Sequence, residues 1–256
     1  MKTDMHFVET STARFHARVV RTIGILDVSI AVHVREWGLA TTMISGHHYP
    51  YNLLAGVFDG ALLSDIEDDY QRHSPHFCVE CASNCQTTGD LIALSAAGLT
   101  PQPSASVMSY SVRTNTPRIP HSNLVWSTAD DTGFVFDYIP EDRERIIRRA
   151  YAAQSESIMV SLLHSDGIIA SAGIRIEDGY GFLFGAWVAP HRRRRGHYQT
   201  LLDARLWYAA EQGCHTIIAH SHQQSAVSRA TIDRGFVHGW ERQRWRRRNK
   251  RQEASR

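Results

Sequence analysis

The residues best suited to bind a charged ligand lie in one stretch, residues 188–202, which reads VAPHRRRRGHYQTLL. Four consecutive arginines, Arg192 to Arg195, precede Gly196, and a helical pattern of leucines begins just after it. The first N–H groups of a helix are unpaired and carry a partial positive charge, so a basic loop that leads into a helix favours a phosphate group. Gly196 has no Cβ, which lets the main chain approach that group. The stretch is neither a P-loop nor a dinucleotide fingerprint, because it has a single glycine and no Gly-Lys-Ser/Thr.

The elements around this loop follow from apolar periodicity and turn residues. Asp178-Gly179 marks a turn between strands, and Gly213 and Gly235 mark helix ends. Arg205 lies at the inward spacing of its helix, together with the leucines of that helix. The second half predicts a helix after Pro140, strands over 158–163, 168–176 and 182–188, a helix over 198–212, a strand over 216–220, a helix over 226–234 and a strand over 236–245.

This arrangement resembles the GNAT superfamily of acetyl-CoA-dependent N-acyltransferases. Their phosphate-binding signature is [Q/R]-x-x-G-x-[G/A] after a strand that ends V-x-P, and here Val188-x-Pro190 precedes Arg193-x-x-Gly196-x-Tyr198. The order of elements agrees from about residue 125 to residue 245. The resemblance implies an α/β (α+β) fold, in which helices flank a mixed, largely antiparallel central sheet. Tyr198 departs from the family's Gly or Ala, which implies a slightly different loop whose backbone donors are retained.

The resemblance also implies a ligand and a reaction. The co-substrate is acetyl-CoA or another acyl-CoA, no metal takes part, and an amine attacks the thioester directly. The main chain of Trp187 and Val188 would bind the pantetheine and polarise the thioester carbonyl, while N–H groups of Arg194 and residues 196–199 would ring the pyrophosphate. No covalent enzyme intermediate is expected, so Cys214 needs no role. The residues expected at the CoA are Trp187, Val188, Arg193, Arg194, Arg195, Gly196, His197, Tyr198 and Gln199.

The residues that would move protons depart from the family's pattern. The family's acid is often a Tyr four residues before a Gly-Phe pair; here the pair is Gly235-Phe236 and that position holds Thr231. The usual Asn before the last helix falls at Gln223 or Gln224. Both departures leave the acid and the base of the reaction unassigned by resemblance.

Three histidines are the candidate catalytic substitutes. His197 lies beside the phosphate loop, and His220 and His222 lie at the end of the strand that would flank the thioester. Histidine is the side chain that normally titrates near pH 7, which suits proton transfer. The chain has fifteen histidines, so most of them must be structural or exposed.

Two functions remain open at this point. The first is an acyl-CoA-dependent N-acyltransferase that transfers an acetyl or other acyl group to an amine. The second is a catalytically inactive GNAT-fold module that binds CoA or docks a partner without turnover. The missing Tyr and Asn favour the second function slightly, whereas the phosphate loop is compatible with both. The sequence identifies neither the acceptor nor the acyl length.

The domain organisation follows from a segment rich in proline, residues 114–123, which reads TNTPRIPHSN and is expected to be a linker. It separates a domain over 1–113 from the acyltransferase domain over 124–245, and residues 246–256 form a basic tail. The first half echoes the second, with helix patterns over 61–70 and 90–97. It therefore resembles the first GNAT-like domain of a tandem protein. We call it degenerate because residues 40–65 contain no glycine-bearing basic loop. An unrelated α/β cap is the alternative.

Three cysteines in the first half have the spacing C-x2-C-x3-C, at Cys78, Cys81 and Cys85. Three thiolates with a fourth ligand, His73 or His76, would hold zinc or an iron–sulfur cluster. The alternative is a strand that ends in a polar loop, since Phe77 and Val79 alternate with less apolar neighbours and no second Cys pair exists. We expect no metal.

Composition and charge limit the partners. The chain has 256 residues and 43% hydrophobic residues, enough for one large or two small cores. Its net charge of +2 is uneven, because seven Arg and one Lys against two Glu give +6 over residues 240–256 and leave −4 elsewhere. We expect Arg242–Arg256 to be a solvated tail with nucleic acid an unlikely partner, and Trp240 and Trp245 to pack the last strand. No apolar run is long enough to span a membrane, so we expect a cytoplasmic protein and no membrane partner. The resemblance implies a small-molecule or peptide amine as substrate, and a homodimer is a further possibility.

Overall fold

The structure is a computed structural model that describes residues 4–45, 52–73, 78–112, 123–127, 141–165 and 167–247. The chain divides into two compact units, one formed by Met1–Ala105 with Trp240–Arg256 and the other by Ser106–Gly239. This division differs from the domains expected over 1–113 and 124–245, because the second unit already begins at Ser106 and the chain from Trp240 onward belongs to the first unit. The expected linker lies outside the described residues, except for Asn123.

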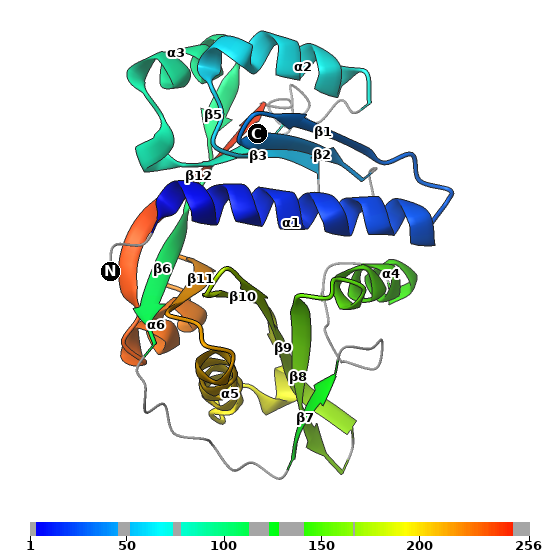
Figure 1. The fold of residues 1–256 in the computed structure, drawn as a ribbon, viewed down its shortest axis with the longest axis vertical. Coiled ribbons are helices and arrows are strands. Elements are labelled where there is room, and N and C mark those ends of the chain that lie inside the picture. Colours follow the sequence, from blue (N-terminus) through cyan, green and yellow to red (C-terminus); the bar gives the residue numbers. More distant parts are fainter. Residues whose placement is uncertain are drawn as a thin grey trace, which may run out of the picture. The chain divides into compact units, whose positions relative to one another are not determined.

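The described part of the first unit consists of a sheet and the helices α1, α2 and α3 (Figure 1). Its strand order is β1-β2-β3-β4-β12, with β5 paired to β12. The pair β3/β4 is parallel, and the pairs β1/β2, β2/β3 and β12/β4 are antiparallel. The elements are α1 Met5–Leu26, β1 His33–Trp37, β2 Ala40–Ile44, β3 Asn52–Gly56, α2 Leu63–Gln71, β4 Cys78–Ala82, α3 Thr88–Ala96, β5 Leu99–Pro101 and β12 Val237–Arg247.

Helix α1 is the longest of the elements that the sequence analysis did not predict. Asp4 caps its start, with Oδ1 accepting a hydrogen bond from Phe7 N at 3.0 Å, and the helix packs against β2 and β3. Its buried face includes Glu9 and three consecutive polar residues, Thr10 to Thr12. Polar residues on a buried face interrupt the apolar period that normally reveals a helix.

Strand β12 explains why the end of the chain is not a solvated tail. Arg242 is 7% exposed, and its Nε and Nη2 donate to Glu9 of α1 at 3.0 Å each. Arg247 donates to Ala97 O at 3.0 Å and to Glu67. The expectation of a solvated segment is therefore wrong for residues 242–247, and residues 248–256 lie outside the described residues. Trp240 and Trp245 are buried, as expected.

The second unit has the predicted order of elements, with a sheet flanked by helices (Figure 1). Its strand order is β6-β11-β10-β9-β8-β7, in which β7 to β10 pair antiparallel and β10 pairs parallel with β11. The expected mixed, largely antiparallel sheet is thus confirmed. The elements are β6 Ala105–Ser111, β7 Leu124–Ser127, α4 Glu141–Ala152, β8 Ser157–His164, β9 Gly167–Glu177, β10 Tyr180–Val188, α5 His197–Glu211, β11 Thr216–His222 and α6 Ala226–Asp233.

Strands β10 and β11 open a gap in this sheet. Their parallel pairing extends only from Tyr180 to Phe182 on β10, although both strands continue beyond it. On its other side, β10 shifts register against β9 between Phe184 and Trp187. Helix α5 packs on β8, β9 and β10. Beyond Phe182, the main chain of β10 is therefore no longer paired with β11. This unpaired stretch lies near the start of α5.

No helix among the described residues has both the length and the apolar character needed to cross a membrane.

Candidate functional site

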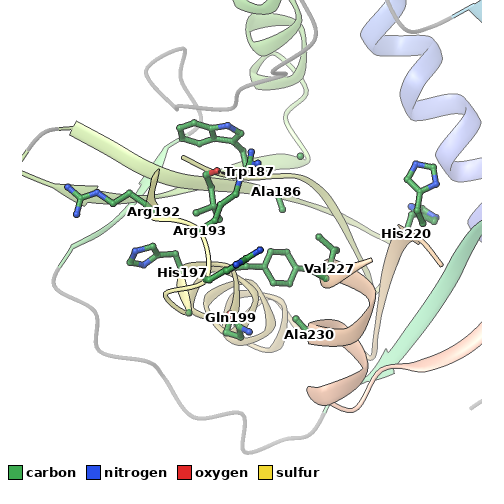
Figure 2. A pocket seen from close by; sticks show the side chains of 16 residues that line it. Ala186, Trp187, Arg192, Arg193, His197, Gln199, His220, Val227 and Ala230 are labelled. Atoms are coloured by element: carbon green, nitrogen blue, oxygen red, sulfur yellow. Dashed lines mark hydrogen bonds between the residues drawn. The ribbon is translucent and has the colours of Figure 1, made fainter. Parts of the chain in front are cut away.

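A cavity of about 970 Å³ lies where β10 and β11 separate, at the start of α5. Its volume is at the upper end of the range for ligand sites, which suits a large ligand. Figure 2 shows Ala186 and Trp187 on one wall, His197 and Gln199 on α5, and Val227 on α6. Of the residues expected at CoA, this cavity is lined by Trp187, Val188, Arg193, Arg194, Gly196, His197, Tyr198 and Gln199. Arg195 is not among the lining residues.

The loop before α5 is built to present main-chain donors. Gly196 is the N-cap of α5 with φ of 82°, and it offers no side chain to cap the helix. The first main-chain hydrogen bond of the helix runs from Thr200 N to Gly196 O at 3.0 Å, so the preceding N–H groups have no intrahelical partner. Arg194 also has a positive φ, 64°, a strained conformation for a non-glycine residue that is typical of functional loops.

The loop is also strongly positive. Arg193 donates from Nε to Val188 O at 3.1 Å, which ties the loop to the end of β10. The pKa of His197 is lowered by burial and by the charges of Arg195 and Arg192. His197 therefore stays largely neutral at pH 7 in the ligand-free protein, while the arginines supply the charge. An anion with several phosphate groups fits this combination of free N–H groups and cations.

Tyr198 is the site residue whose side chain the sequence analysis left without a role. Its hydroxyl lies 3.1 Å from Thr231 Oγ1, and Thr231 Oγ1 donates to Val227 O at 2.8 Å. Since the proton of Thr231 is committed to that carbonyl, Tyr198 is the donor in the bond between the two hydroxyls. The departure from Gly or Ala thus places a phenol where α5 and α6 meet, at the position where the resemblance led us to expect an acid.

A second, smaller cavity of about 280 Å³ adjoins the first within the gap between β10 and β11. Tyr198, His220 and His222 line both cavities. Arg205, a residue that the sequence placed on the inward face of α5, lines the smaller one. The structure thus brings His220 and His222 to the gap, as expected, while His197 lies at the phosphate-loop end of the larger cavity (Figure 2).

The two residues at the position of the family's Asn line neither cavity. Gln223 and Gln224 are absent from both linings, and Gln224 has φ of 58° in the turn before α6. Its carbonyl accepts from Arg229 Nη1 at 2.6 Å, and Ser225 caps α6 by accepting from Ser228 N at 3.0 Å. These residues shape the start of α6 and have a structural role.

The cysteines are not suited to nucleophilic chemistry. Burial raises the pKa of Cys78 and of Cys214 to about 11, so both are thiols at neutral pH. Cys78 and Cys81 are buried on β4, which fits the strand interpretation, and the side chain of Cys85 lies outside the described residues.

One group in the described part of the chain brings potential metal ligands together, on β1, on α2 and just after α2. His33, Asp69 and His73 have ligand atoms within 4.8 Å of one another. The carboxylate of Asp69 already bonds His33 Nε2 at 2.8 Å and Arg35 Nη1 at 3.0 Å, and the rings of His33 and His73 are stacked at 3.8 Å. The cluster is an ion-paired contact in the first unit.

Comparison with known proteins identifies the second unit. The sequence profile of the acetyltransferase (GNAT) family matches residues 124–236. No curated protein sequence is significantly similar to the chain.

Solved structures extend the likeness over most of the chain. A tandem GNAT protein from the clavulanic acid biosynthesis pathway is 11% identical with a TM-score of 0.60, covering 91% of this chain and 88% of that one. A GCN5-related N-acetyltransferase from Kribbella flavida is 14% identical with a TM-score of 0.57, covering 93% and 95%. A functionally unknown protein from Staphylococcus epidermidis is 10% identical with a TM-score of 0.59, covering 89% and 97%. At these identities the likeness establishes the fold. The chain therefore carries a domain of the acetyltransferase (GNAT) family at residues 124–236, within a fold that it shares with a tandem GNAT protein.

Proposed function

We propose that the protein is an acyl-CoA-dependent N-acyltransferase that acts on an amine. The observation that carries the proposal is the continuity of the site: free N–H groups and arginines at the start of α5 lead directly into the gap between β10 and β11. The phosphates of CoA would lie at the loop, and the main chain of Trp187 and Val188 would hold the pantetheine. The thioester would then reach the smaller cavity.

The reaction needs one group to accept a proton and another to donate one. The amine nitrogen attacks the thioester carbonyl carbon, the C–S bond breaks, and the thiolate takes a proton as it leaves. We assign the donor role to the hydroxyl of Tyr198, because it lines both cavities and already donates to Thr231. His220 and His222 are the candidate bases, since both line the gap. His197 is better placed to contact phosphate than the thioester.

The first unit is proposed to bind no CoA, because its equivalent loop carries carboxylates. Strands β3 and β4 form a parallel pair, as β10 and β11 do, and the loop between β3 and α2 contains Gly60. There Asp90 Oδ1 accepts from Gly60 N at 2.6 Å and Asp59 Oδ1 accepts from Ala61 N at 2.9 Å. The donors that would hold a phosphate are occupied, and the carboxylates would repel it. We expect calorimetry with CoA to give one site per chain; two equivalent sites would contradict this assignment.

The test of the function is thiol release from acetyl-CoA in the presence of amines: amino acids, polyamines, aminoglycosides and peptides with a free N-terminus. Release that depends on an amine supports the enzyme. Saturable CoA binding without release from any acyl donor would favour the alternative, a module that binds CoA without turnover. That alternative is less consistent with the phenol of Tyr198 at the junction of the two cavities.

A further inference from the structure

The smaller cavity is lined by apolar side chains, by serines and histidines, and by one buried cation. Its volume of about 280 Å³ is below the range of sites that hold a whole drug-sized ligand, so it suits a short chain. It opens toward the gap where the thioester of a bound acyl-CoA would lie. The residues that line this cavity and not the larger one are Leu183, Phe184, Arg205, Ala219, Ser221 and Ser225.

Arg205 is almost fully buried but incompletely bonded. Its side chain is 1% exposed, Nε donates to Leu201 O at 3.1 Å, and Nη1 donates to Gly173 O at 3.3 Å. Nη2 is buried and has no hydrogen-bond partner among the described residues. Both acceptors are neutral carbonyls. Burial lowers the pKa of Arg205, whereas a charge interaction and a side-chain hydrogen bond with Tyr198 act in the opposite direction. None of the three partners of Arg205 is a carboxylate.

The other buried arginines among the described residues each pair with a carboxylate. Arg242 has the carboxylate of Glu9 at 3.0 Å, and Arg175 pairs with Glu177. A buried charge is strongly unfavourable unless it is paired, which explains these two contacts. Among these three buried arginines, Arg205 is the one without a carboxylate partner, and it is the one that lines a cavity of the site.

We propose that the smaller cavity takes the acyl group of the donor, and that Arg205 binds a carboxylate at the far end of that group. The preferred donor is then a short dicarboxylic acyl-CoA of the malonyl or succinyl type. This inference rests on the proposed function, and it names the substrate class of the same site. A guanidinium nitrogen forms a strong, charge-assisted hydrogen bond to a carboxylate, whereas a neutral acyl group of similar length would leave Nη2 unpaired.

The test compares succinyl-CoA with butyryl-CoA, which has a methyl group where succinyl-CoA has the carboxylate. Calorimetry on the full chain is expected to show at least tenfold tighter binding of succinyl-CoA. Arg205→Met is expected to reduce this ratio to near one, and thermal melting checks that the variant is folded. Arg234→Met is the matched control, because Arg234 pairs with Asp203 on the surface and lines neither cavity; it should keep the ratio.

The outcomes separate this inference from the proposed function. If neither acyl-CoA nor free CoA binds, the function itself is wrong. If succinyl-CoA and butyryl-CoA bind equally in the unmodified chain, the inference is wrong while the function stands, and this comparison needs no variant. An acceptor is the other source of a carboxylate, so thiol release is also measured with amino acids and their decarboxylated amines. A carboxylate preference that depends on Arg205 among acceptors, without one among donors, would overturn the assignment to the acyl group.

Discussion

The hydroxyl of Tyr198 lies 3.1 Å from Oγ1 of Thr231, so that the first turn of α5 and the helix α6 meet through two hydroxyl groups. Thr231 is fully buried, and its own proton is held by Val227 O at 2.8 Å. Tyr198 therefore donates its hydrogen bond to the neutral hydroxyl of Thr231, which is a weak acceptor that a ligand can replace. A stronger acceptor nearby, such as a departing thiolate, would take that hydrogen bond, and this makes the phenol a suitable proton donor.

Replacement of Tyr198 by Phe tests this role directly. The ring and its packing remain, and only the hydroxyl is lost. General acid catalysis contributes about 10²- to 10⁴-fold, so we expect kcat for thiol release to fall by at least about tenfold with little change in the KM for the acyl-CoA. Thr231→Val is the control, because it removes the acceptor and leaves the phenol. A Tyr198→Phe enzyme with the parent's kcat would exclude the hydroxyl as the donor.

The two histidines at the gap can be distinguished in the same assay. His220 and His222 lie on β11 two residues apart, and both line the two cavities. If one of the two is the base, its replacement by Gln should lower kcat by roughly 10²-fold and weaken the rise of activity with pH. The same replacement of the other histidine should have a small effect. Equal, small effects at both positions would mean that the base is elsewhere or that the amine reacts already deprotonated.

The loop before α5 and the hairpin before β10 were predictable because their signals are local. The run of arginines before Gly196 and the leucine spacing after it fix a loop followed by a helix, and the Asp178-Gly179 turn fixes the hairpin before β10. Contacts between distant segments were not predictable. The spacing placed Arg205 on the inward face of its helix. No local pattern reveals that one of its partners is the carbonyl of Gly173 on β9 and not a carboxylate. The same is true of Glu9, whose partners lie 231 and 233 residues further along the chain.

The pH dependence of CoA binding should show whether the ring of His197 contacts a phosphate group. Burial and the neighbouring Arg195 and Arg192 lower its pKa in the free protein, whereas bound phosphates would raise it. Binding then takes up a proton, so affinity rises as pH falls through the bound-state pKa and levels off below the free-state pKa. Each unit of difference between the two pKa values is worth up to about tenfold in affinity. His197→Gln should remove this component of the pH dependence measured by calorimetry; an unchanged pH profile would show that the ring does not contact phosphate.

The stability of the first unit should depend on the buried pair of Glu9 and Arg242. Glu9 is 2% exposed and accepts from Arg242 and from Trp240 Nε1 at 2.8 Å. Glu9→Ala leaves the guanidinium without this partner, and we expect a loss of about 3–5 kcal/mol in the free energy of unfolding. Glu36→Ala is the matched control, because Glu36 is 55% exposed and pairs with Arg21 at 3.6 Å, so we expect less than about 1 kcal/mol. Denaturant titration measures both, and equal losses would contradict the inference from burial.

The last prediction concerns Gly196, the residue that most directly supports the phosphate-loop assignment. A Cβ added there would meet no atom within 4 Å, so the cost within the protein comes from its φ of 82°. Gly196→Ala should therefore destabilise the fold by about 1–2 kcal/mol. Gly196→Asp adds a charge next to the phosphates; at about 4 Å and an effective dielectric near 20, two unit charges interact by about 4 kcal/mol, an upper value for a site open to solvent.

Half of that energy weakens CoA binding by more than about tenfold, since each decade corresponds to about 1.4 kcal/mol. Gly213→Asp provides the control, because Gly213 has φ of 72°, equally open surroundings and a position after the far end of α5. It should lose similar stability and keep the parent's affinity for CoA. Calorimetry and thermal melting on the two variants thus separate damage to the site from damage to the fold. If Gly196→Asp binds CoA as tightly as Gly213→Asp, the start of α5 does not hold the phosphates, and the acyltransferase proposal loses its main support.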